Sequence, residues 1–430
     1  MIFLFILYQL VQLTLAPLAI LTIALWCLKR NIVHNLGQRV GLVPRTPAGK
    51  KAIWIHAVSV GEALSVQELI KLIKQEIPNA WCTVTIGTLM GYRMAYKNLP
   101  ADSISYVPYD FLSCMLLAYY RINPSALIIV EADLWPNLLG LAKLKNIPSF
   151  LLNARISKRS EPRVFALKPI MRQLFSCFTH IFPQSTHDQT TLARLGIPAE
   201  KLTILGNLKT FNVLYKQRAT SKIPACAGYQ ILLAGSIHPT EDQVYCTLFQ
   251  QLKPDFPNLK LVLVPRHFTW HDQLVATLTS TNSPYKIYTE QNTSTAPLDL
   301  CQALTTNDIV VISRMGMLFD LYQQATLFFL GGTFVHVGGH NLLEPAVWGI
   351  PSLVGPYQSF CHDTLASLEA ANAARSVRDA HELLKSTREL LENQELHLQM
   401  GRNNQTWVEQ EAQHVEHILR LHVLQKLQRA

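Results

Sequence analysis

The segment AIWIHAVSVGEALSVQELIKLI, residues 52–73, predicts a buried strand that passes directly into a helix. Residues 52–58 are mostly apolar and have the length of a strand, and the apolar residues after Gly61 recur at helical spacing. Short apolar runs followed by amphipathic stretches recur along the chain in two series, which is typical of β/α units around parallel sheets. We therefore expect an α/β protein with two doubly wound, Rossmann-like domains.

Ten apolar runs are predicted to be strands, five in each series. The first series is 52–58, 81–85, 126–130, 149–152 and 180–183. The second series is 230–234, 261–264, 309–312, 327–330 and 352–354. The chain is accordingly divided into a membrane-anchor helix (1–28), an N-terminal domain (29–212), a weakly patterned connection (213–229), a C-terminal domain (230–395) and a helical tail (396–430).

Length and composition fit folded domains of this kind. At about 150 residues per domain, 430 residues make two or three units. With 49% hydrophobic and 16% charged residues, the bulk of the chain is predicted to fold. The net charge of +9 favours anionic partners, but the sequence has no zinc finger and no aromatic RNA-binding motif. We therefore expect phosphate-bearing ligands or a membrane surface as partners, and no nucleic acid.

The eight cysteines form no CxxC pair and no zinc-like cluster. Such spacing is expected of separate thiols in a reducing compartment. We therefore predict that the folded domains face the cytosol and hold no structural metal.

The first 28 residues contain no charged side chain. At about 1.5 Å of helical rise per residue, they could cross a hydrocarbon core of about 30 Å. Four residues weaken the span and leave a cleaved signal peptide or an interfacial helix as alternatives: Tyr8, Gln9, Gln12 and Pro17. Basic residues follow the apolar run at Lys29, Arg30, Arg39 and Arg45. Their position predicts a retained anchor with the remainder of the chain on the cytoplasmic side.

Glu62 lies where the strand 52–58 gives way to the helix. A carboxylate there, above the ends of parallel strands, could take the proton of an acceptor hydroxyl, and Gly61 would let a substrate approach the backbone. A glutamate in the first turn of a helix also complements the helix dipole without any catalytic role. Spacing alone leaves both interpretations open.

Glu131 and Asp133 follow the predicted strand 126–130. Two acids at this spacing could hold a divalent metal, as in metal-dependent sugar transferases. The alternative is a helix start capped by Asp133, in which the two acids do not converge on one ion. Lys209 follows the apolar run 202–205 and could either meet an anion or lie on the surface.

The second series carries candidate phosphate contacts at its strand ends. Arg266 follows the run 261–264 and Pro265, and it offers a guanidinium fork to a phosphate. The segment 235–239, GSIHP, follows another strand and could present free amides to an anion or form a simple turn.

The stretch 331–345 contains two glycine pairs and predicts a helix start near Asn341. Free amides at that start would suit a phosphate, and Glu344 would be available to ribose hydroxyls. The stretch matches neither GxGxxG nor the P-loop, and a structural glycine turn is the alternative.

Taken together, these segments resemble the 3-deoxy-D-manno-octulosonic acid (Kdo) transferases of glycosyltransferase family 30, which have the GT-B fold. The motifs follow the apolar N-terminus in order: HAVSVGE (56–62), YVPYD (106–110), LWPN (134–137), NARIS (153–157), GNLK (206–209), VPRH (264–267) and GGHNLLEP (338–345). Each motif alone is weak, but their shared order and spacing are specific, and they cover nearly the whole chain.

The resemblance implies an inverting transfer of Kdo from CMP-Kdo to the lipid A precursor (lipid IVA) in lipopolysaccharide core biosynthesis, at the cytoplasmic face of the inner membrane. It implies no cofactor, no metal, and anionic phospholipid as the membrane partner. Carried over motif by motif, Glu62 is the general base, and Glu131 and Lys209 stabilise the transition state. The residues implied to bind the donor are Pro265, Arg266, Met315, Gly316, Met317, Asn341, Leu342, Leu343 and Glu344.

Three segments depart from the family pattern. Residues 131–133, EAD, stand where many members have Glu-Thr-Glu, so the first acid is kept and the second is shortened. Residues 313–318, SRMGML, replace Asp-Thr-Met-Gly-Glu-Leu, which removes two acids and leaves a backbone contact for Met317. Residues 235–239 replace a common Ser-Thr-His segment.

Two other functions remain open at this point. One is another membrane-associated GT-B protein that uses a UDP-sugar or epimerises a sugar. The other is a non-enzymatic, membrane-tethered lipid-binding protein whose basic residues hold anionic headgroups.

Overall fold

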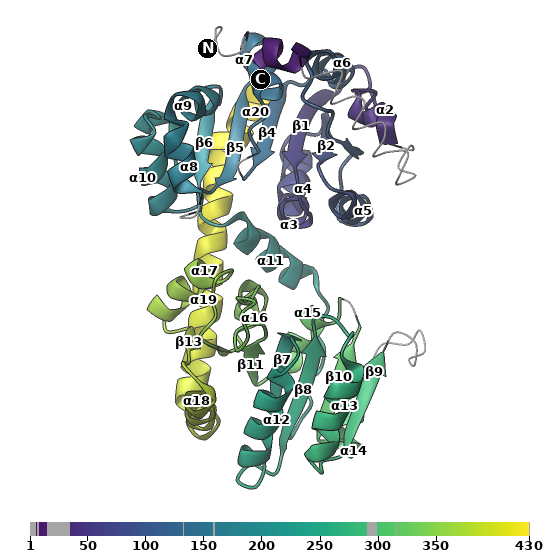
Figure 1. The fold of residues 1–430 in the computed structure, drawn as a ribbon, viewed down its shortest axis with the longest axis vertical. Helices are drawn as coiled ribbons and strands as arrows, with labels where there is room; N and C mark the ends of the chain where they lie inside the picture. The colour runs from purple at the N-terminus through teal and green to yellow at the C-terminus, as the bar shows by residue number, and fades with distance from the viewer. Residues whose placement is uncertain are drawn as a thin grey trace. The chain divides into compact units, whose positions relative to one another are not determined.

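The computed structural model describes residues 6, 8–14, 35–131, 133–157, 160–289, 299–314 and 316–429 (Figure 1). These residues form two compact units. The first unit combines the chain up to Asn212 with Glu411–Ala430, and the second unit is Val213–Gln410. Each unit is built around a sheet of parallel strands, so the predicted α/β class is confirmed.

The first unit contains a six-stranded sheet in the order β3-β2-β1-β4-β5-β6. Its strands are β1 (Lys51–Ala57), β2 (Ala80–Ile86), β3 (Ser103–Tyr106), β4 (Ala126–Val130), β5 (Ser149–Ala154) and β6 (His180–Pro183). The chain winds outward from β1 in one direction and from β4 in the other, which makes the sheet doubly wound. In its core the fully buried ring of Trp54 meets Tyr119 edge-on, with ring centres 5.0 Å apart.

Helices connect these strands and cover the sheet (Figure 1). They are α2 (Leu36–Arg39), α3 (Val60–Ser65), α4 (Gln67–Glu76), α5 (Leu89–Asn98), α6 (Leu112–Ile122), α7 (Pro136–Leu144), α8 (Glu161–Ala166), α9 (Lys168–Ser176), α10 (Thr186–Arg194) and the 3₁₀ turn η2 (Ala199–Lys201). In α4, Leu69, Ile70 and Ile73 are fully buried, whereas Gln75 and Glu76 are exposed. This is the helical periodicity on which the prediction for 52–73 rested.

The second unit contains a seven-stranded sheet in the order β13-β12-β11-β7-β8-β10-β9. Its strands are β7 (Gln230–Ile237), β8 (Leu259–Pro265), β9 (Tyr285–Thr289), β10 (Ile309–Ser313), β11 (Leu327–Leu330), β12 (Ser352–Val354) and β13 (Ala374–Ser376). Its helices are α12 (Glu241–Leu252), α13 (His271–Ser280), α14 (Leu300–Thr306), α15 (Leu318–Leu321), η3 (Tyr322–Gln324), α16 (Leu343–Val347), α17 (His362–Ala370) and α18 (Ala380–Glu392). In its core, the buried rings of Tyr245 and Phe329 stack with centres 5.4 Å apart.

All ten predicted strands are present, each close to its expected bounds. The sequence missed β3, β9 and β13, each of which lies at an edge of its sheet. An edge strand has one neighbour and less buried surface, so SISY, YKIYT and ARS lack the continuous apolar run that marks an interior parallel strand.

Helix α11 (Leu208–Ala219) begins in the first unit and ends in the second. The sequence predicted a weakly patterned connection over 213–229, but residues 213–219 of that segment are helical. Polar residues along this helix have partners of their own. Asn212 donates to the Ser65 carbonyl of the first unit, and Lys216 pairs with Glu344 of the second. Because such polar residues interrupt the apolar pattern, the sequence of this segment resembled that of a linker.

The C-terminal helices return to the first unit. They are α19 (Gln394–Ile418), the π-helical turn η4 (Leu419–Leu424) and α20 (Gln425–Arg429). The tail predicted at 396–430 is not a segment apart, since Glu411–Ala430 belongs to the first unit. Val415, Leu419 and Val423 recur every four residues and are fully buried, and Arg420 forms an ion pair with Glu76 of α4.

Cys226 and Cys301 form a disulfide, with their Cα atoms 5.1 Å apart. The prediction of eight separate thiols is therefore wrong for this pair. The two cysteines are 75 residues apart in the chain, and they meet because the connection folds against the second unit. Gln324 holds the same connection by donating to the carbonyl of Pro224 at 3.1 Å. The free cysteines in the described ranges are 82, 114, 177, 246 and 361.

The membrane anchor predicted at 1–28 lies mostly outside the described residues. Within the described part of the chain, no helix is both long and apolar enough to cross a membrane. Tyr8 donates from its hydroxyl to Asp110 Oδ2 at 2.9 Å, and Gln12 donates to the Asp110 carbonyl at 2.6 Å. Two polar residues that weaken the apolar segment therefore contact the YVPYD motif.

The contact of β6 with the C-terminal helix generates a pH prediction. His180 is hydrogen-bonded to Thr203 Oγ1 at 2.8 Å, and its ring stacks on His422. Burial, together with Lys426, His422 and Lys201, lowers the pKa of His180 to about 4. A histidine in an unfolded chain titrates near 6.5, so between about pH 7 and about pH 4 the unfolded chain binds a proton at this position that the folded chain does not bind. The free energy of unfolding therefore falls as the pH drops through this range.

We expect the urea midpoint of the wild-type protein to fall over this pH range, and to fall less in His180→Asn. Tryptophan fluorescence at a series of pH values measures both midpoints, with His381→Asn on the exposed face of α18 as the matched control. An equal fall in the wild-type protein and His180→Asn would contradict this origin of the acid sensitivity.

Candidate functional site

Glu62 forms a capping box at the start of α3. Ser59 is the N-cap residue, and its Oγ accepts from the backbone N–H of Glu62 at 3.3 Å. The Glu62 carboxylate accepts from Ser59 Oγ and from the Val58 backbone N–H, both at 2.8 Å. The structural role that the sequence left open is thus present, and the side chain is 9% exposed. These contacts fix the carboxylate at the end of β1, where it can also serve as a base.

Glu131 and Lys209 face each other beside this turn. Glu131 directly follows β4 and adopts a positive φ of 62°, which turns its side chain out of the strand direction. Its Oε1 lies 3.8 Å from Lys209 Nζ. Lys209 Nζ lies beside the turn at Gly61, because a Cβ built at that position would be 4.0 Å from it, an ordinary van der Waals distance.

Asn153 and Arg155 complete this group and were not predicted as site residues. Asn153 Oδ1 accepts from the backbone N–H of Leu208 at 3.2 Å, which holds the first turn of α11 and with it Lys209. Burial raises the pKa of Glu131, Lys209 and Arg155 lower it, and Glu62 raises it. The only sequence signal for either residue was the NARIS motif.

The structure therefore brings Glu62, Glu131 and Lys209 near one another. They come from the ends of β1 and β4 and from the start of α11, segments that are distant in sequence. The charges of Lys209 and Glu62 both act on the pKa of Glu131, and clusters of ionisable groups of this kind are candidates for acid–base sites.

Asp133 does not join this group. Its Oδ2 accepts from Trp135 Nε1 at 2.6 Å and is paired with Nε2 of the fully buried His56 at 2.8 Å. The two acids of the EAD segment thus have different partners, which argues against their shared use for one metal. In the described ranges, no group of three or more His, Cys, Asp or Glu residues could hold a metal ion.

In the second unit, Pro265 ends β8 and Arg266 follows it. The Arg266 backbone N–H donates to the Ile237 carbonyl at 2.9 Å, which ties the ends of β7 and β8 together. Burial lowers the pKa of both His238 and His340, and the charge of Arg266 lowers it further. The structure thus places Arg266 near His238, which follows β7, and near His340, which lies in the glycine-rich stretch 331–345.

Glu241 organises the glycine-rich stretch and was missed by the sequence analysis. Its fully buried carboxylate accepts four backbone N–H groups at 2.7 to 3.0 Å: those of Gly332, Thr333, Phe334 and His238. The Gly332 carbonyl in turn accepts from Gly338 and Gly339. The one available signal was an acid in the first turn of a helix after GSIHP.

Glu344 pairs with Lys216 of α11, with Oε1 and Nζ 3.5 Å apart. The same ammonium group lies 3.6 Å from the ring centre of Phe319. Lys216 therefore joins the GGHNLLEP segment to the segment that follows Gly316, although the sequence placed it in the connection.

The helix expected near Asn341 begins at Leu343 and ends at Val347. Asn341 Oδ1 accepts from the Leu343 backbone N–H at 2.9 Å, while Leu342 and Leu343 are buried. The helix is only five residues long, so its dipole is short, and the phosphate site expected at its start stays a prediction.

The segment 313–318 is partly described. Met315 lies outside the described residues. Gly316 has a φ of 83°, and Met317 is the N-cap residue of α15. The Met317 carbonyl accepts from the backbone N–H groups of Asp320 and Leu321. The backbone at this position therefore has a structural role at the start of α15.

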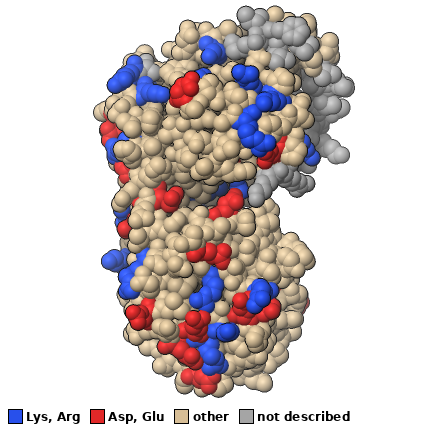
Figure 2. All heavy atoms as spheres, turned by 90° about the vertical axis from the view of Figure 1, so that its left-hand side faces the viewer, with Lys and Arg blue, Asp and Glu red and all other residues tan. Residues whose placement is uncertain are grey.

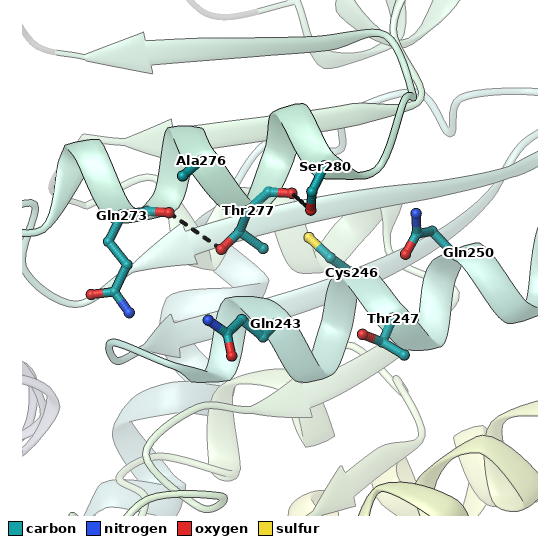
Figure 3. Close-up of a pocket in the computed structure, with 8 residues that line it drawn as sticks. All are labelled: Gln243, Cys246, Thr247, Gln250, Gln273, Ala276, Thr277 and Ser280. Carbon is teal, nitrogen blue, oxygen red and sulfur yellow. Dashed lines mark hydrogen bonds between the residues drawn. The ribbon is translucent and has the colours of Figure 1, made fainter.

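A groove of about 470 Å³ lies between α12 and α13 of the second unit (Figure 3). Figure 3 shows it lined by neutral side chains from the two helices. The hydroxyls of Thr277 and Ser280 donate to carbonyls of their own helix, at 3.2 and 2.7 Å. With no charged group and with these hydroxyls occupied, the groove offers little to an anionic ligand.

Charged side chains are scattered over one face of the protein. On the face shown in Figure 2, basic and acidic side chains are interspersed and large areas carry neither. The excess of positive charge is not gathered into one patch on that face.

Sequence comparisons identify the family. The family profile described as 3-deoxy-D-manno-octulosonic-acid transferase (kdotransferase) matches residues 34–212. The 3-deoxy-D-manno-octulosonic acid transferase of Haemophilus influenzae is 31% identical over 313 residues, which cover 71% of each chain. This chain belongs to the Kdo transferase family.

Another Kdo transferase agrees with this placement. The enzyme of Chlamydophila psittaci is 29% identical over 360 residues, which cover 80% of each chain. The UDP-GlcNAc 2-epimerase of Neisseria meningitidis, solved with UDP-GlcNAc bound, superimposes with a TM-score of 0.59 at 13% identity, over 86% of this chain and 99% of that one. That likeness shows the fold alone, and it agrees with the expected GT-B architecture. The chain is therefore a Kdo transferase enzyme, a glycosyltransferase.

The Glu241 carboxylate generates a stability prediction for this Kdo transferase. In Glu241→Gln the amide NH₂ faces N–H donors, which leaves buried backbone groups unpaired at a cost of about 1–3 kcal/mol each. We expect a lower urea midpoint for the second unit, measured by circular dichroism, with the exposed Glu409→Gln as control. A midpoint equal to that of the control would show that the carboxylate is not needed to hold the loop.

Proposed function

We propose that this Kdo transferase moves Kdo from CMP-Kdo to the lipid A precursor (lipid IVA), with inversion and without a metal. The observation that carries the proposal is the convergence of Glu62, Glu131 and Lys209 in a member of the family. These residues come from three separate motifs, and each occupies the position to which the family resemblance assigns a catalytic role.

Glu62 acts as the general base in this proposal. The acceptor oxygen forms a bond to the anomeric carbon of Kdo while the bond from that carbon to the phosphate of CMP breaks. The proton of the acceptor hydroxyl passes to Glu62, and the electron pair leaves with CMP. The capping box favours this role because it holds the carboxylate in one orientation before the acceptor arrives.

Glu131 and Lys209 stabilise the transition state. Transfer from a sugar donor passes through an oxocarbenium-like state, whose positive charge favours a nearby carboxylate. Burial raises the pKa of Glu131, and the Lys209 ammonium group, 3.8 Å away, opposes that rise; the same ammonium group can offset negative charge on the leaving phosphate.

The donor-binding residues of the proposal are Pro265, Arg266, Met315, Gly316, Met317, Asn341, Leu342, Leu343 and Glu344. CMP leaves as a monophosphate, so there is no diphosphate for a metal to chelate. Lys216 holds Glu344 in place for the ribose hydroxyls. The loss of acids in 313–318 leaves the backbone of Met317 as its contact.

The anchor and the location are also part of the proposal. We assign residues 1–28 to a single anchor in the inner membrane, in contact with anionic phospholipid, and the enzyme to lipopolysaccharide biosynthesis. The absence of charge in this segment and the basic residues that follow it support a cytoplasmic position for the folded units. In this proposal, residues 29–212 bind the acceptor and residues 230–395 bind the CMP-Kdo donor.

Mass spectrometry of a tetra-acylated lipid A precursor, incubated with detergent-purified protein and CMP-Kdo, tests the reaction. We expect mass increments of one or more Kdo units, with or without EDTA, and none with Glu62→Gln. Glutamine is the suitable substitution because it can keep the capping box while it removes the base. An equal melting temperature for the two proteins checks that the fold is retained.

Three outcomes would contradict parts of the proposal. No increment with the wild-type protein, alongside an active control enzyme, would reject CMP-Kdo as donor and direct the assay to UDP-sugars. Loss of activity in EDTA would reject metal independence. Unchanged turnover by Glu62→Gln would reject the base.

Arg266→Ala tests the phosphate contact. Loss of a charged hydrogen bond costs about 1.5–3 kcal/mol, so we expect CMP to bind about tenfold to a hundredfold more weakly. Calorimetry with CMP measures this, with the exposed Arg378→Ala of the same unit as control. Equal CMP affinity in Arg266→Ala and the wild-type protein would show that this side chain does not hold the phosphate.

A further inference from the structure

Three neighbouring strands of the second unit deliver basic side chains to one edge of the sheet. β7 lies between β11 and β8, and all three run parallel. His238 directly follows β7, Arg266 and His267 follow β8, and His340 lies in the glycine-rich stretch 331–345 that follows β11. The ends of β7 and β11 approach closely, because a Cβ on Gly331 would lie 2.4 Å from the carbonyl oxygen of Ser236.

These side chains form a cluster without an acidic partner. Burial is the main cause that lowers the pKa of His238, followed by His267 and Arg266. Partial burial likewise lowers the pKa of His340, which keeps an exposed face, and Arg266 and His238 follow as causes. In the described part of the chain, no ion pair joins these residues to an aspartate or glutamate, and the nearby Glu241 carboxylate is occupied by backbone N–H groups. Such a cluster favours an anion.

Both imidazole rings have neighbours in the second unit. The backbone N–H of His238 donates to Glu241 at 2.9 Å, and its ring lies over Gly332, whose Cβ would be 3.4 Å from Cδ2. The Nε2 atom of His238 is buried and has no hydrogen-bond partner among the described residues. The His340 ring stacks on exposed Phe360 with centres 5.9 Å apart. A buried, unpaired ring nitrogen next to a guanidinium group is a group left for a ligand.

The donor of the proposed function carries two anionic groups, a phosphodiester and the carboxylate of the sugar acid. The Arg266 guanidinium suits the phosphate. We infer that His238 and His340 bind the carboxylate of the Kdo unit in CMP-Kdo and thereby select an acidic sugar over a neutral one. This inference rests on the proposed function, which supplies the donor.

Calorimetry without acceptor, using CMP-Kdo and CMP as separate ligands, tests the inference. We expect His238→Gln and His340→Gln to weaken CMP-Kdo binding about tenfold or more, as for loss of a charged hydrogen bond, with CMP affinity changed less than about threefold. His381→Gln, on the exposed face of α18, is the matched control. His340 is itself exposed, so its variant tests the inference even if His238→Gln is unstable.

The pH dependence gives a second readout. The carboxylate and the phosphodiester stay ionised between about pH 6 and about pH 8, so a change in affinity over that range comes from the protein. Anion binding favours the protonated imidazoles, so CMP-Kdo should bind the wild-type protein more tightly as the pH falls. The double variant should lose most of this dependence.

The outcomes separate this inference from the proposed function. If the variants weaken CMP and CMP-Kdo equally, the histidines hold the phosphate and the inference is wrong. If they weaken neither ligand, the cluster does not contact the donor, which also overturns it. If the wild-type protein binds CMP but not CMP-Kdo, the proposed donor fails instead.

Discussion

Parallel pairing of adjacent strands is the constraint on which the residue cluster of each unit depends. In the first unit β1 pairs with β4, so the turns after these strands meet at one edge of the sheet. In the second unit β7 pairs with both β8 and β11, and three loops meet in the same way. Because all the strands point in one direction, the carboxyl ends gather residues that are far apart in the chain. The pairing of these strands therefore determines which charged side chains lie close together in each unit.

Backbone groups at these strand ends are satisfied by the side chains of the site itself. Glu62 caps α3, Asn153 holds the start of α11, and Glu241 binds four N–H groups of the second unit. Unpaired backbone groups near a buried edge would be costly, so these side chains stabilise the loops whether or not a substrate is present. The same contacts fix the groups proposed to act on substrate, so stability and positioning have one structural origin. A structural role for Glu62 is therefore compatible with a catalytic one.

The two units differ in the charge that they present at their sheet edges. The first unit places two carboxylates beside one ammonium group, which suits proton transfer and the stabilisation of a cationic transition state. The second unit places imidazoles around a guanidinium group with no described acidic partner, which suits an anionic donor. A net charge of +9 says nothing of this division, and the mixed charges on the face in Figure 2 do not reveal it.

The sequence by itself determined the α/β class, the interior strands and the positions of Glu62, Glu131, Lys209 and Arg266 at strand ends or helix starts. Apolar runs mark interior strands because both faces of a parallel sheet are buried, and the family motifs mark the candidate site residues in sequence order. The tertiary structure alone decided the edge strands, the return of the C-terminal helix, and the pairing of Cys226 with Cys301. It also decided that Asp133 turns to His56 and that Glu241 holds the glycine-rich stretch. These features depend on contacts between residues distant in the chain, and such contacts leave no local periodicity in the sequence.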